Sequence, residues 1–314
     1  METILVTGGA GFIGSNIVRH SLNRGYNVRV LDNLSTGSKS NIAGLPVEFI
    51  EGDVTDKEIV KGATRDVRFI FHDAAVSASP MFVPDPSHGI NVNVMGFANV
   101  ISSAIANGVE KVVYVMTSSM YGNSKPPWAE DKLLVSDVPN IYASSLLDRA
   151  FIANQVEKTS GIKTVGLVYF SVYGPYEAAK KDYANIISQF LWSIKKSDPP
   201  ILYGDGSQTR DFVHAEDVAK ANLLAAESAY SGGYVNVGTG VSVSMKDVVD
   251  KLCEIMGSDI EPIYKPNPIY GYCYHTLADV SKAKRNIGFE ASIGIDEGLK
   301  SLVRFYEDKQ EMTA

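Results

Sequence analysis

Short apolar runs alternate with amphipathic segments through the first half of the chain. The first apolar run, Thr3–Thr7, is followed by a glycine-rich turn and then by helical periodicity from Phe12 to Arg24. A second run, Val28–Leu31, closes at Asp32. A strand, a helix and a second strand in this order predict a right-handed unit with parallel strands.

The same alternation continues to about residue 170. Further predicted strands are Val47–Ile50, Phe69–His72, Lys111–Met116 and Thr164–Tyr169, with predicted helices at about Asn91–Asn107 and Tyr142–Thr159. Strands that alternate with helices are typical of α/β proteins, so we predict a doubly wound, parallel Rossmann sheet.

Regularity falls after about residue 170, where prolines and glycines mark longer loops. Examples are Pro199-Pro200, Gly204, Gly206, Gly232-Gly233 and a Pro- and Tyr-rich stretch over 262–274. We therefore predict a Rossmann domain over residues 1–170. A smaller C-terminal lobe over 171–314 would mainly bind substrate, with parts of about 200–245 returning to the Rossmann sheet.

Composition and charge exclude several classes of protein. The 314 residues are 45% apolar and 21% charged, which is ordinary for a globular protein, and the net charge of −7 gives no global attraction for nucleic acid or an anionic membrane. No apolar run approaches the ~18 residues of a membrane span, and no basic leader with a cleavage site is visible. Cys253 and Cys273 lack metal-ligand spacing. We expect a cytoplasmic protein with no metal site.

The glycine-rich turn carries the clearest chemistry. Gly8, Gly11 and Gly14 stand between a strand and a helix, where a tight turn lets backbone N–H groups face a pyrophosphate, and Phe12 and Ile13 lie within the same turn. The alternative is a merely flexible turn.

Two carboxylates extend this dinucleotide site. Asp32 closes the second strand, where it can accept hydrogen bonds from ribose hydroxyls and repel a 2′-phosphate, so the sequence favours NAD over NADP. Asp53, after the third strand, could accept a hydrogen bond from the adenine amine. The alternative for both residues is a solvated side chain.

At these residues the chain resembles a known family. The segments Thr7–Ser15 and Asp32–Ser35 resemble those of an extended short-chain dehydrogenase/reductase of the NAD-dependent epimerase/dehydratase type, and the resemblance covers nearly the whole chain. Phe71–Ala75 resembles the family's strand end beside the cofactor, and Asn91–Gly96 resembles its helix start. The resemblance implies that NAD also contacts Asn33, Val54, Ala74 and Asn93.

The family's chemistry couples hydride transfer at a sugar carbon to proton transfer at its hydroxyl. By resemblance, Thr117 matches the hydroxyl that holds the sugar oxygen, and Tyr142 matches the catalytic tyrosine, which also contacts the nicotinamide ribose. The family's lysine, four residues later, is replaced by Leu146. A tyrosine with a pKa of about 10 is a poor base, and leucine cannot lower that pKa. The alternative is a strand-end hydroxyl and a helix-start aromatic ring without catalysis.

Two later stretches resemble the UDP-glucose and UDP-N-acetylglucosamine 4-epimerases, namely Lys181–Ile187 and Gly204–Val218. Arg210 then matches the residue that grips a nucleotide diphosphate, which suits a planar, bidentate donor. The alternative is a surface ion pair with Asp211. Ser118 and Ser171 are the other candidate substrate contacts.

Three positions lack a side chain that relatives carry. Ser171 stands where relatives have an asparagine, Val168 where they have an arginine, and Ile269 where a second diphosphate-binding arginine is expected. The half of the site that would bind substrate has therefore lost charge.

Taken together, the residues favour an NAD-dependent nucleotide-sugar epimerase, most closely a UDP-hexose 4-epimerase, which oxidises the sugar transiently and reduces it again. By resemblance, the helices beginning near Asn91 and Tyr142 would form a homodimer. Two alternatives stay open: an NAD-dependent dehydrogenase or dehydratase acting on another sugar or polyol, and a non-catalytic NAD-binding protein, which Leu146 supports. A Gly-x-Ser-x-Gly elbow and a phosphate loop are absent, which argues against hydrolases and triphosphatases.

Overall fold

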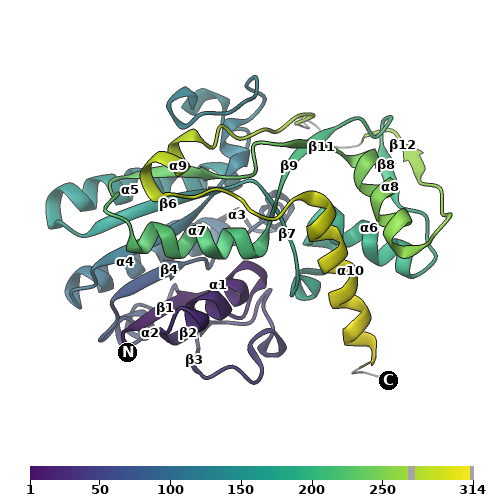
Figure 1. Ribbon diagram of the computed structural model, residues 1–314. Coiled ribbons are helices and arrows are strands. Elements are labelled where there is room, and N and C mark those ends of the chain that lie inside the picture. Colours follow the sequence, from purple (N-terminus) through teal and green to yellow (C-terminus); the bar gives the residue numbers. More distant parts are fainter. Residues whose placement is uncertain (268–272, 312–314) are drawn as a thin grey trace.

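A large parallel sheet organises the first lobe of the protein (Figure 1). The computed structural model describes residues 1–267 and 273–311, and within these ranges seven strands form this sheet. In spatial order they are β10 (Gly233–Val237), β6 (Lys163–Tyr169), β5 (Lys111–Thr117), β4 (Phe69–His72), β1 (Thr3–Thr7), β2 (Asn27–Asp32) and β3 (Val47–Glu51). Every pairing between them is parallel.

The strand order contains one point where the chain changes direction across the sheet. From β1 the chain builds outward through β2 and β3, and then returns to place β4 on the other side of β1. Ligands of open α/β sheets bind in the crevice outside the carboxyl ends of the strands at such a point. The predicted fold class is confirmed, and its switch point lies between β1 and β4.

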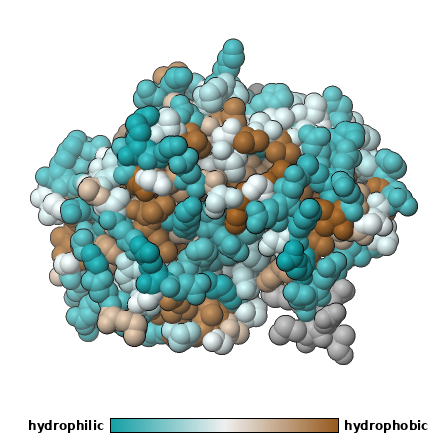
Figure 2. Space-filling view, in the orientation of Figure 1, coloured by the Kyte–Doolittle hydropathy of each residue, from teal (hydrophilic) through white to brown (hydrophobic). Residues whose placement is uncertain are grey.

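Helices cover both faces of the sheet. The main ones are α1 (Phe12–Asn23), α7 (Ala215–Glu227) and α9 (Ser281–Ile287) on one face, and α2 (Lys57–Ala63), α4 (Gly96–Ala106) and α5 (Ile141–Ser160) on the other. Each face packs its own apolar cluster against the strands, so the central strands β1, β4, β5 and β6 are almost wholly buried, whereas the edge strand β3 is not. Hydrophilic side chains cover most of the outward surface in Figure 2, with smaller apolar patches among them.

One helix corrects an expectation from the sequence. The short helix α3 (Pro86–Ile90), a π-helical turn η3 (Asn91–Met95) and α4 run on as one helix of 21 residues, within which an 18-residue window has a mean hydropathy of 1.3. By length and composition alone this segment could cross a membrane, so the expectation that no run approaches that length is wrong. Half of the residues in that window are buried inside the fold, as expected for a helix that packs against a sheet.

The second lobe is smaller and mixed. Its elements are β7 (Ser171–Tyr173), β8 (Ile201–Tyr203), β9 (Thr209–His214), β11 (Ser242–Ser244), β12 (Ile263–Lys265), α6 (Ile186–Lys195), α8 (Met245–Met256) and α10 (Ile295–Glu311). The helices α6, α8 and α10 share an apolar cluster of their own. From the second half of the chain, α7 and β10 pack into the first lobe, so the chain passes between the lobes more than once.

Candidate active site

A cavity of about 460 Å³ opens at the carboxyl ends of the parallel strands. Most of the predicted site residues line it: Gly8, Gly11, Phe12, Ile13, Asp32, Asn33, Asp53, Val54, Ala74, Thr117, Ser118, Tyr142 and Ser171. Gly14, Asn93 and Arg210 are not among its lining residues. The cavity therefore unites segments that lie far apart in the sequence, at the place where α/β folds bind ligands.

The glycine turn has no room for side chains. Gly8 has a φ of +72°, and a Cβ there would lie 2.9 Å from the backbone nitrogen of Ala74. A Cβ on Gly14 would lie 2.1 Å from the carbonyl oxygen of Gly8. The turn thus stays narrow, and the first amides of α1 lie beside the cavity. Such a helix N-terminus behind a glycine turn fits the pyrophosphate of a dinucleotide.

Asp32 is held rigidly at the end of β2. One carboxylate oxygen accepts the N–H of Ala10 at 2.9 Å, and the other accepts the N–H of Leu34 at 2.7 Å. Burial raises the pKa of Asp32, and these backbone N–H groups oppose the rise by stabilising the carboxylate. The carboxylate lines the cavity with its position fixed, as a hydrogen-bond acceptor for a ribose requires.

Asn33 and Asp53 form the far end of the cavity. The Asn33 amide donates to Asp53 at 2.6 Å, and both the backbone N–H and the hydroxyl of Thr55 donate to the other oxygen of that carboxylate at 2.8 Å. Burial opposes ionisation of Asp53, but these hydrogen bonds outweigh it and hold its pKa below the ordinary value. Val54 follows directly, so this end offers a polar edge beside an apolar wall.

Asn93 lies behind the cavity wall. Its side chain accepts the N–H of Val76 at 2.8 Å, and it donates to the carbonyl of Val76 at 3.2 Å and to the hydroxyl of Ser145 at 3.0 Å. It therefore ties the segment after β4 to helix α5. In this structure Asn93 positions the wall that carries Ala74 and Val76.

Tyr142 and Thr117 both line the cavity. Tyr142 lies in the first turn of α5, which Asn140 caps by accepting the N–H of Ala143 at 2.9 Å, and Thr117 ends β5. Burial raises the pKa of Tyr142, whereas a hydrogen bond with Thr117 and the positive charge of Arg149 lower it. The two predicted catalytic side chains thus line the same cavity, and Thr117 influences the ionisation of Tyr142.

Leu146 occupies the position one helical turn after Tyr142. Its side chain lines the cavity and is only 1% exposed, so the position at which the resemblance leads us to expect a lysine is apolar. This position of α5 therefore supplies no ammonium group to the cavity.

Sequence reasoning missed a buried cation on the same helix. Arg149 is fully buried, and its guanidinium donates to the carbonyls of Asn93 at 2.9 Å, Ala74 at 3.0 Å and Val115 at 3.3 Å. Burial lowers its pKa to about 9, while the nearby acidic groups of Asp73 and Tyr142 favour the charged form. A signal existed, because a residue seven positions after Tyr142 lies on the same helix face.

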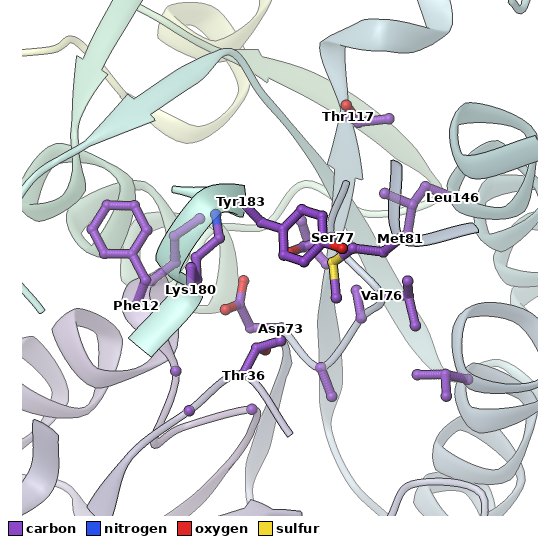
Figure 3. Close-up of a pocket in the computed structure, with 18 of the residues that line it drawn as sticks. Phe12, Thr36, Asp73, Val76, Ser77, Met81, Thr117, Leu146, Lys180 and Tyr183 are labelled. Atoms are coloured by element: carbon purple, nitrogen blue, oxygen red, sulfur yellow. The ribbon is translucent and has the colours of Figure 1, made fainter. Parts of the chain in front are cut away.

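Three charged residues that were not predicted line the cavity, namely Asp73, Glu177 and Lys180. Asp73 follows β4 directly, and Lys180 belongs to η7 (Ala178–Tyr183), a short 3₁₀ segment that leads into the second lobe. Figure 3 shows both side chains directed toward the same part of the cavity. Burial raises the pKa of Asp73 to about 7, against the opposing charges of Arg149 and Lys180 and a hydrogen bond from the N–H of Gly14.

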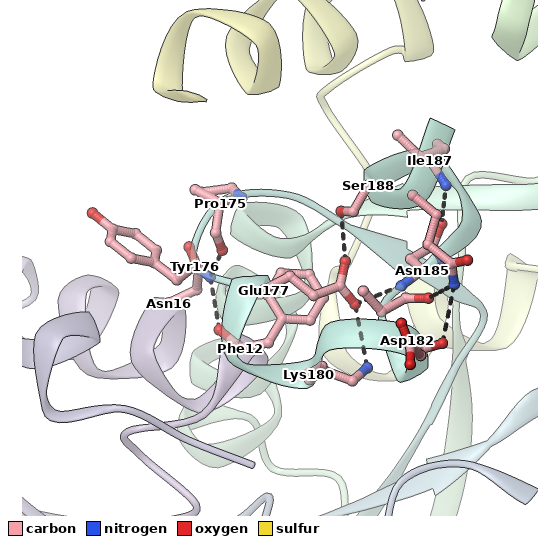
Figure 4. A network of polar contacts seen from close by, with 12 residues as sticks. Phe12, Asn16, Pro175, Tyr176, Glu177, Lys180, Asp182, Asn185, Ile187 and Ser188 are labelled. Carbon is pink, nitrogen blue, oxygen red and sulfur yellow. Dashed lines mark hydrogen bonds and ion pairs between the residues drawn. The ribbon is translucent and has the colours of Figure 1, made fainter. Parts of the chain in front are cut away.

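The segment η7 is anchored by a buried carboxylate (Figure 4). Glu177 accepts hydrogen bonds from the hydroxyl of Ser188 at 2.7 Å, the N–H of Asn185 at 2.8 Å and the ammonium of Lys180 at 3.2 Å. On the other side, the amide of Asn16 in α1 donates to the carbonyl of Pro175 at 3.3 Å. These contacts fix Lys180 over the cavity between the two lobes.

The predicted substrate residues divide into two groups. Ser118 and Ser171 line the cavity. The guanidinium of Arg210 donates to the carbonyls of Thr209 at 2.8 Å and Tyr274 at 3.2 Å, on the strand β9 that pairs with β7.

Asp211 and Val168 are buried and have structural roles. Asp211, the proposed ion-pair partner of Arg210, is buried, and its oxygens accept N–H groups of Thr239, Gly240 and Ala278. Val168 lies in the buried core, and Ile269 lies outside the residues that the structure describes. Within the described ranges, no group of three His, Cys, Asp or Glu residues is placed to hold a metal ion.

Comparison with known proteins agrees with this geometry. The model of the NAD-dependent epimerase/dehydratase family matches residues 4–238. The chain belongs to this family. The family resemblance seen in the sequence is thereby confirmed, as is the prediction of NAD as the cofactor. The glycine turn, the open amides of α1 and the fixed carboxylate of Asp32 fit such a cofactor.

Solved structures of similar proteins cover almost the whole chain. UDP-glucose 4-epimerase from Thermotoga maritima, solved with UDP-glucose, is 31% identical with a TM-score of 0.91, covering 98% of this chain and 99% of that one. UDP-N-acetylglucosamine 4-epimerase from Methanobrevibacter ruminantium, in complex with UDP-N-acetylmuramic acid, is 29% identical with a TM-score of 0.92 and the same coverage. UDP-glucose 4-epimerase from Thermus thermophilus, in complex with NAD, is 32% identical with a TM-score of 0.84, covering 97% and 99%.

Proposed function

We propose that this protein is an NAD-dependent epimerase that inverts C4 of a UDP-hexose. The observation that carries the proposal is that Thr117 and Tyr142 line one cavity together with the dinucleotide turn. The names of the similar solved proteins supply the substrate class. A tyrosine and a hydroxyl side by side can hold a sugar oxygen and move its proton, which is the acid–base part of an epimerisation.

The chain's own residues divide the work between the two ends of the cavity. The amides of α1 would hold the pyrophosphate of NAD, Asp32 the adenosine ribose, and Asp53 with Asn33 the adenine. Tyr142 would contact the nicotinamide ribose. When bound, NAD supplies a hydride acceptor and donor. Tyr142 would take the proton from the sugar hydroxyl, and Thr117 would hold the oxygen of that hydroxyl.

The charge that assists Tyr142 would come from an unusual place. Because Leu146 is apolar, the cation nearest in the helix is Arg149, whose positive charge lowers the pKa of Tyr142. Arg149 is tied to three carbonyls beneath the cavity and cannot also hold a ribose. We therefore propose a working but weakened proton relay.

The substrate would lie between Ser118, Ser171 and the second lobe. Arg210 stands on the strand next to that of Ser171, and we propose that it binds the diphosphate after leaving one of its two carbonyl partners. Arg210→Ala should then weaken UDP binding by roughly 2 kcal/mol, the scale of a charge-assisted pair, with NAD binding unchanged. Equal competition by UDP against both proteins would remove Arg210 from the site.

A direct assay tests the proposed function. The purified protein is incubated with NAD and UDP-glucose, UDP-N-acetylglucosamine or UDP-glucuronate, and the products are followed by proton NMR, which separates the C4 epimers. We expect one of the sugars to equilibrate with its C4 epimer, and Tyr142→Phe to abolish the conversion. Oxidation or dehydration of a sugar without epimer formation would instead favour a dehydrogenase or dehydratase.

A non-catalytic, NAD-binding role is the second candidate, and the closed, apolar position of Leu146 favours it. It predicts tight NAD binding with no conversion of any sugar, at any pH.

We further propose that the protein forms a homodimer through α4 and α5. Apolar side chains remain exposed on or next to these helices, with Met95 and Phe151 each 53% exposed, Ile141 47% and Ile105 42%. Light scattering coupled to size exclusion should give twice the chain mass of 34.0 kDa, and Phe151→Asp should lower it toward the monomer. The cytoplasmic location stays a prediction.

A further inference from the structure

Asp73 places a carboxylate at the anion-binding end of the cofactor cavity. It follows β4 at the switch point beside β1, its backbone N–H donates to the carbonyl of Thr7 at 3.2 Å, and it lines the cavity. The backbone N–H of Gly14, in the first turn of α1, favours the ionised form of its side chain and so opposes the rise in its pKa. Its backbone lies 3.2 Å from where a Cβ of Gly8 would be, so it adjoins the glycine turn. The carboxylate of Asp73 therefore lies beside the amides that a pyrophosphate needs.

Two anions would compete for this helix N-terminus. The amides and dipole of α1 stabilise one negative group well, but a second negative group beside it is repelled. An ionised Asp73 and the pyrophosphate of NAD are such a pair. A neutral carboxylic acid removes the repulsion, and its O–H becomes a donor that can face a phosphate oxygen.

The charges around Asp73 come from every neighbouring element. Arg149 from α5 and Lys180 from η7 favour its ionised form, and Asp32 from β2 opposes it. The negative charge of Asp73 in turn raises the pKa of Tyr142 in α5 and of Tyr169 in β6. Lys180 is partly engaged by Glu177, and Arg149 donates to three carbonyls, so neither cation is committed to Asp73 alone.

The adjacent His72 adds no positive charge. It is buried, its Nδ1 is 2.9 Å from the hydroxyl of Thr7, and burial holds its pKa well below 6.5. Burial of Asp73 outweighs the two cations and brings its pKa to about 7, so a second anion arriving nearby shifts it across neutrality.

We propose that Asp73 takes up a proton when NAD binds, and that it acts as a positioning residue which makes cofactor affinity fall with rising pH. The proposal concerns cofactor binding alone and holds whichever sugar the protein acts on. A protein with bound NAD and no sugar conversion would therefore refute the proposed function and leave this inference standing.

Isothermal titration of the cofactor-free protein with NAD tests the proposal. At each pH between 6 and 8.5, binding is measured in two buffers of different ionisation enthalpy, and the difference in heat gives the number of protons taken up. We expect uptake that rises toward one proton at pH 8.5, with a dissociation constant that increases by up to about tenfold per pH unit above neutrality.

Variants assign the proton. Asp73→Asn retains an oxygen that can accept the N–H of Gly14 but cannot titrate, so it should bind NAD with the same affinity at pH 6 and 8.5 and take up no proton. His88→Gln is the matched control, since the His88 side chain also lines the cavity. Glu58→Gln removes an exposed carboxylate outside the cavity. Both controls should keep the wild-type slope.

Three results would overturn the proposal. The first is wild-type affinity that stays flat across this range with no buffer dependence of the heat. The second is a slope that persists in Asp73→Asn, and the third is a slope lost in His88→Gln. The wild-type buffer dependence needs no substitution, so the test remains decisive even if Asp73→Asn fails to fold.

Discussion

Asp32 would combine two tasks in one carboxylate, because the oxygens that we expect to bind a ribose also accept the N–H groups of Ala10 and Leu34. We expect NAD to bind at least tenfold more tightly than NADP, a difference of about 1.4 kcal/mol, since a 2′-phosphate would meet this negative charge. Asp32→Ala should reduce this difference in affinity, mainly by weakening the binding of NAD. Titration calorimetry with both cofactors measures it, and equal affinities for the wild-type protein would remove Asp32 from the ribose site.

Leu146 offers the opposite kind of test, a restored charge. Lysine at this position would lie one turn after Tyr142 on the same helix face, beside the cavity. We expect Leu146→Lys to raise turnover of the UDP-hexose tenfold or more, about 1.4 kcal/mol off the barrier. Because a second cation stabilises the phenolate, the rising limb of the pH–rate profile should move to lower pH.

The control for that gain is Tyr142→Phe in the Leu146→Lys background, which should abolish it. The measurements are the epimer ratio against time, from pH 6 to 9, for the parent and both variants. If the lysine brings no gain at any pH while NAD remains bound, Leu146 belongs to a site built for other chemistry, or for none.

At the scale of elements, the glycine turn and α1 act as one unit. A Cβ on Gly14 would lie 2.1 Å from the carbonyl oxygen of Gly8, and backbone cannot move aside as a flexible side chain can. Gly14→Ala should therefore abolish measurable NAD binding and lower the free energy of unfolding by roughly 1–3 kcal/mol.

Gly62 in α2 is the matched control for this substitution. A Cβ there meets nothing within 4 Å, and its φ is not positive. Gly62→Ala should raise the free energy of unfolding by about 0.5–1 kcal/mol and leave NAD binding intact. Chemical denaturation and calorimetry of the two variants separate the steric effect of Gly14 from a general effect of alanine.

At the scale of the whole molecule, Asp73 links stability to pH. Its pKa is raised to about 7 in the fold, whereas an unfolded aspartate ionises near pH 4, so between these values the folded protein holds the extra proton. Stability from this group is therefore greatest below about pH 4 and decreases as pH rises toward 7, by up to about 1.4 kcal/mol per pH unit.

In the cofactor-free protein, this pH dependence should appear when the free energies of unfolding of the wild type and of Asp73→Asn are compared across pH. The stability gain of Asp73→Asn over the wild type should be absent near pH 4, increase to pH 7 and then level off. Urea denaturation across this range measures the gain and cancels groups common to both proteins. A gain that does not change with pH would mean that Asp73 ionises normally in the fold.

Much of the fold was readable from short segments of the chain. Strand and helix periodicity, the glycine turn and the acid at the end of β2 are local features, because a turn without room for a Cβ is set by residues a few positions apart. The family signature around Tyr142 was equally local. These features sufficed to predict the parallel sheet and NAD as the cofactor, whereas the switch point between β1 and β4 was seen only in the strand order of the structure.

The charges inside the cavity were decided by tertiary packing. Asp73, Arg149 and Lys180 come from three elements separated by dozens of residues, and their effect on one another depends on burial and distance, which no local pattern encodes. Lys180 belongs to an irregular 3₁₀ segment with no periodicity to place it. Asn93 likewise became a support behind the wall only when α5 packed against it. Long-range contacts in a low-dielectric interior, rather than residue types alone, therefore determine the ionisation of the charged groups in the site of this protein.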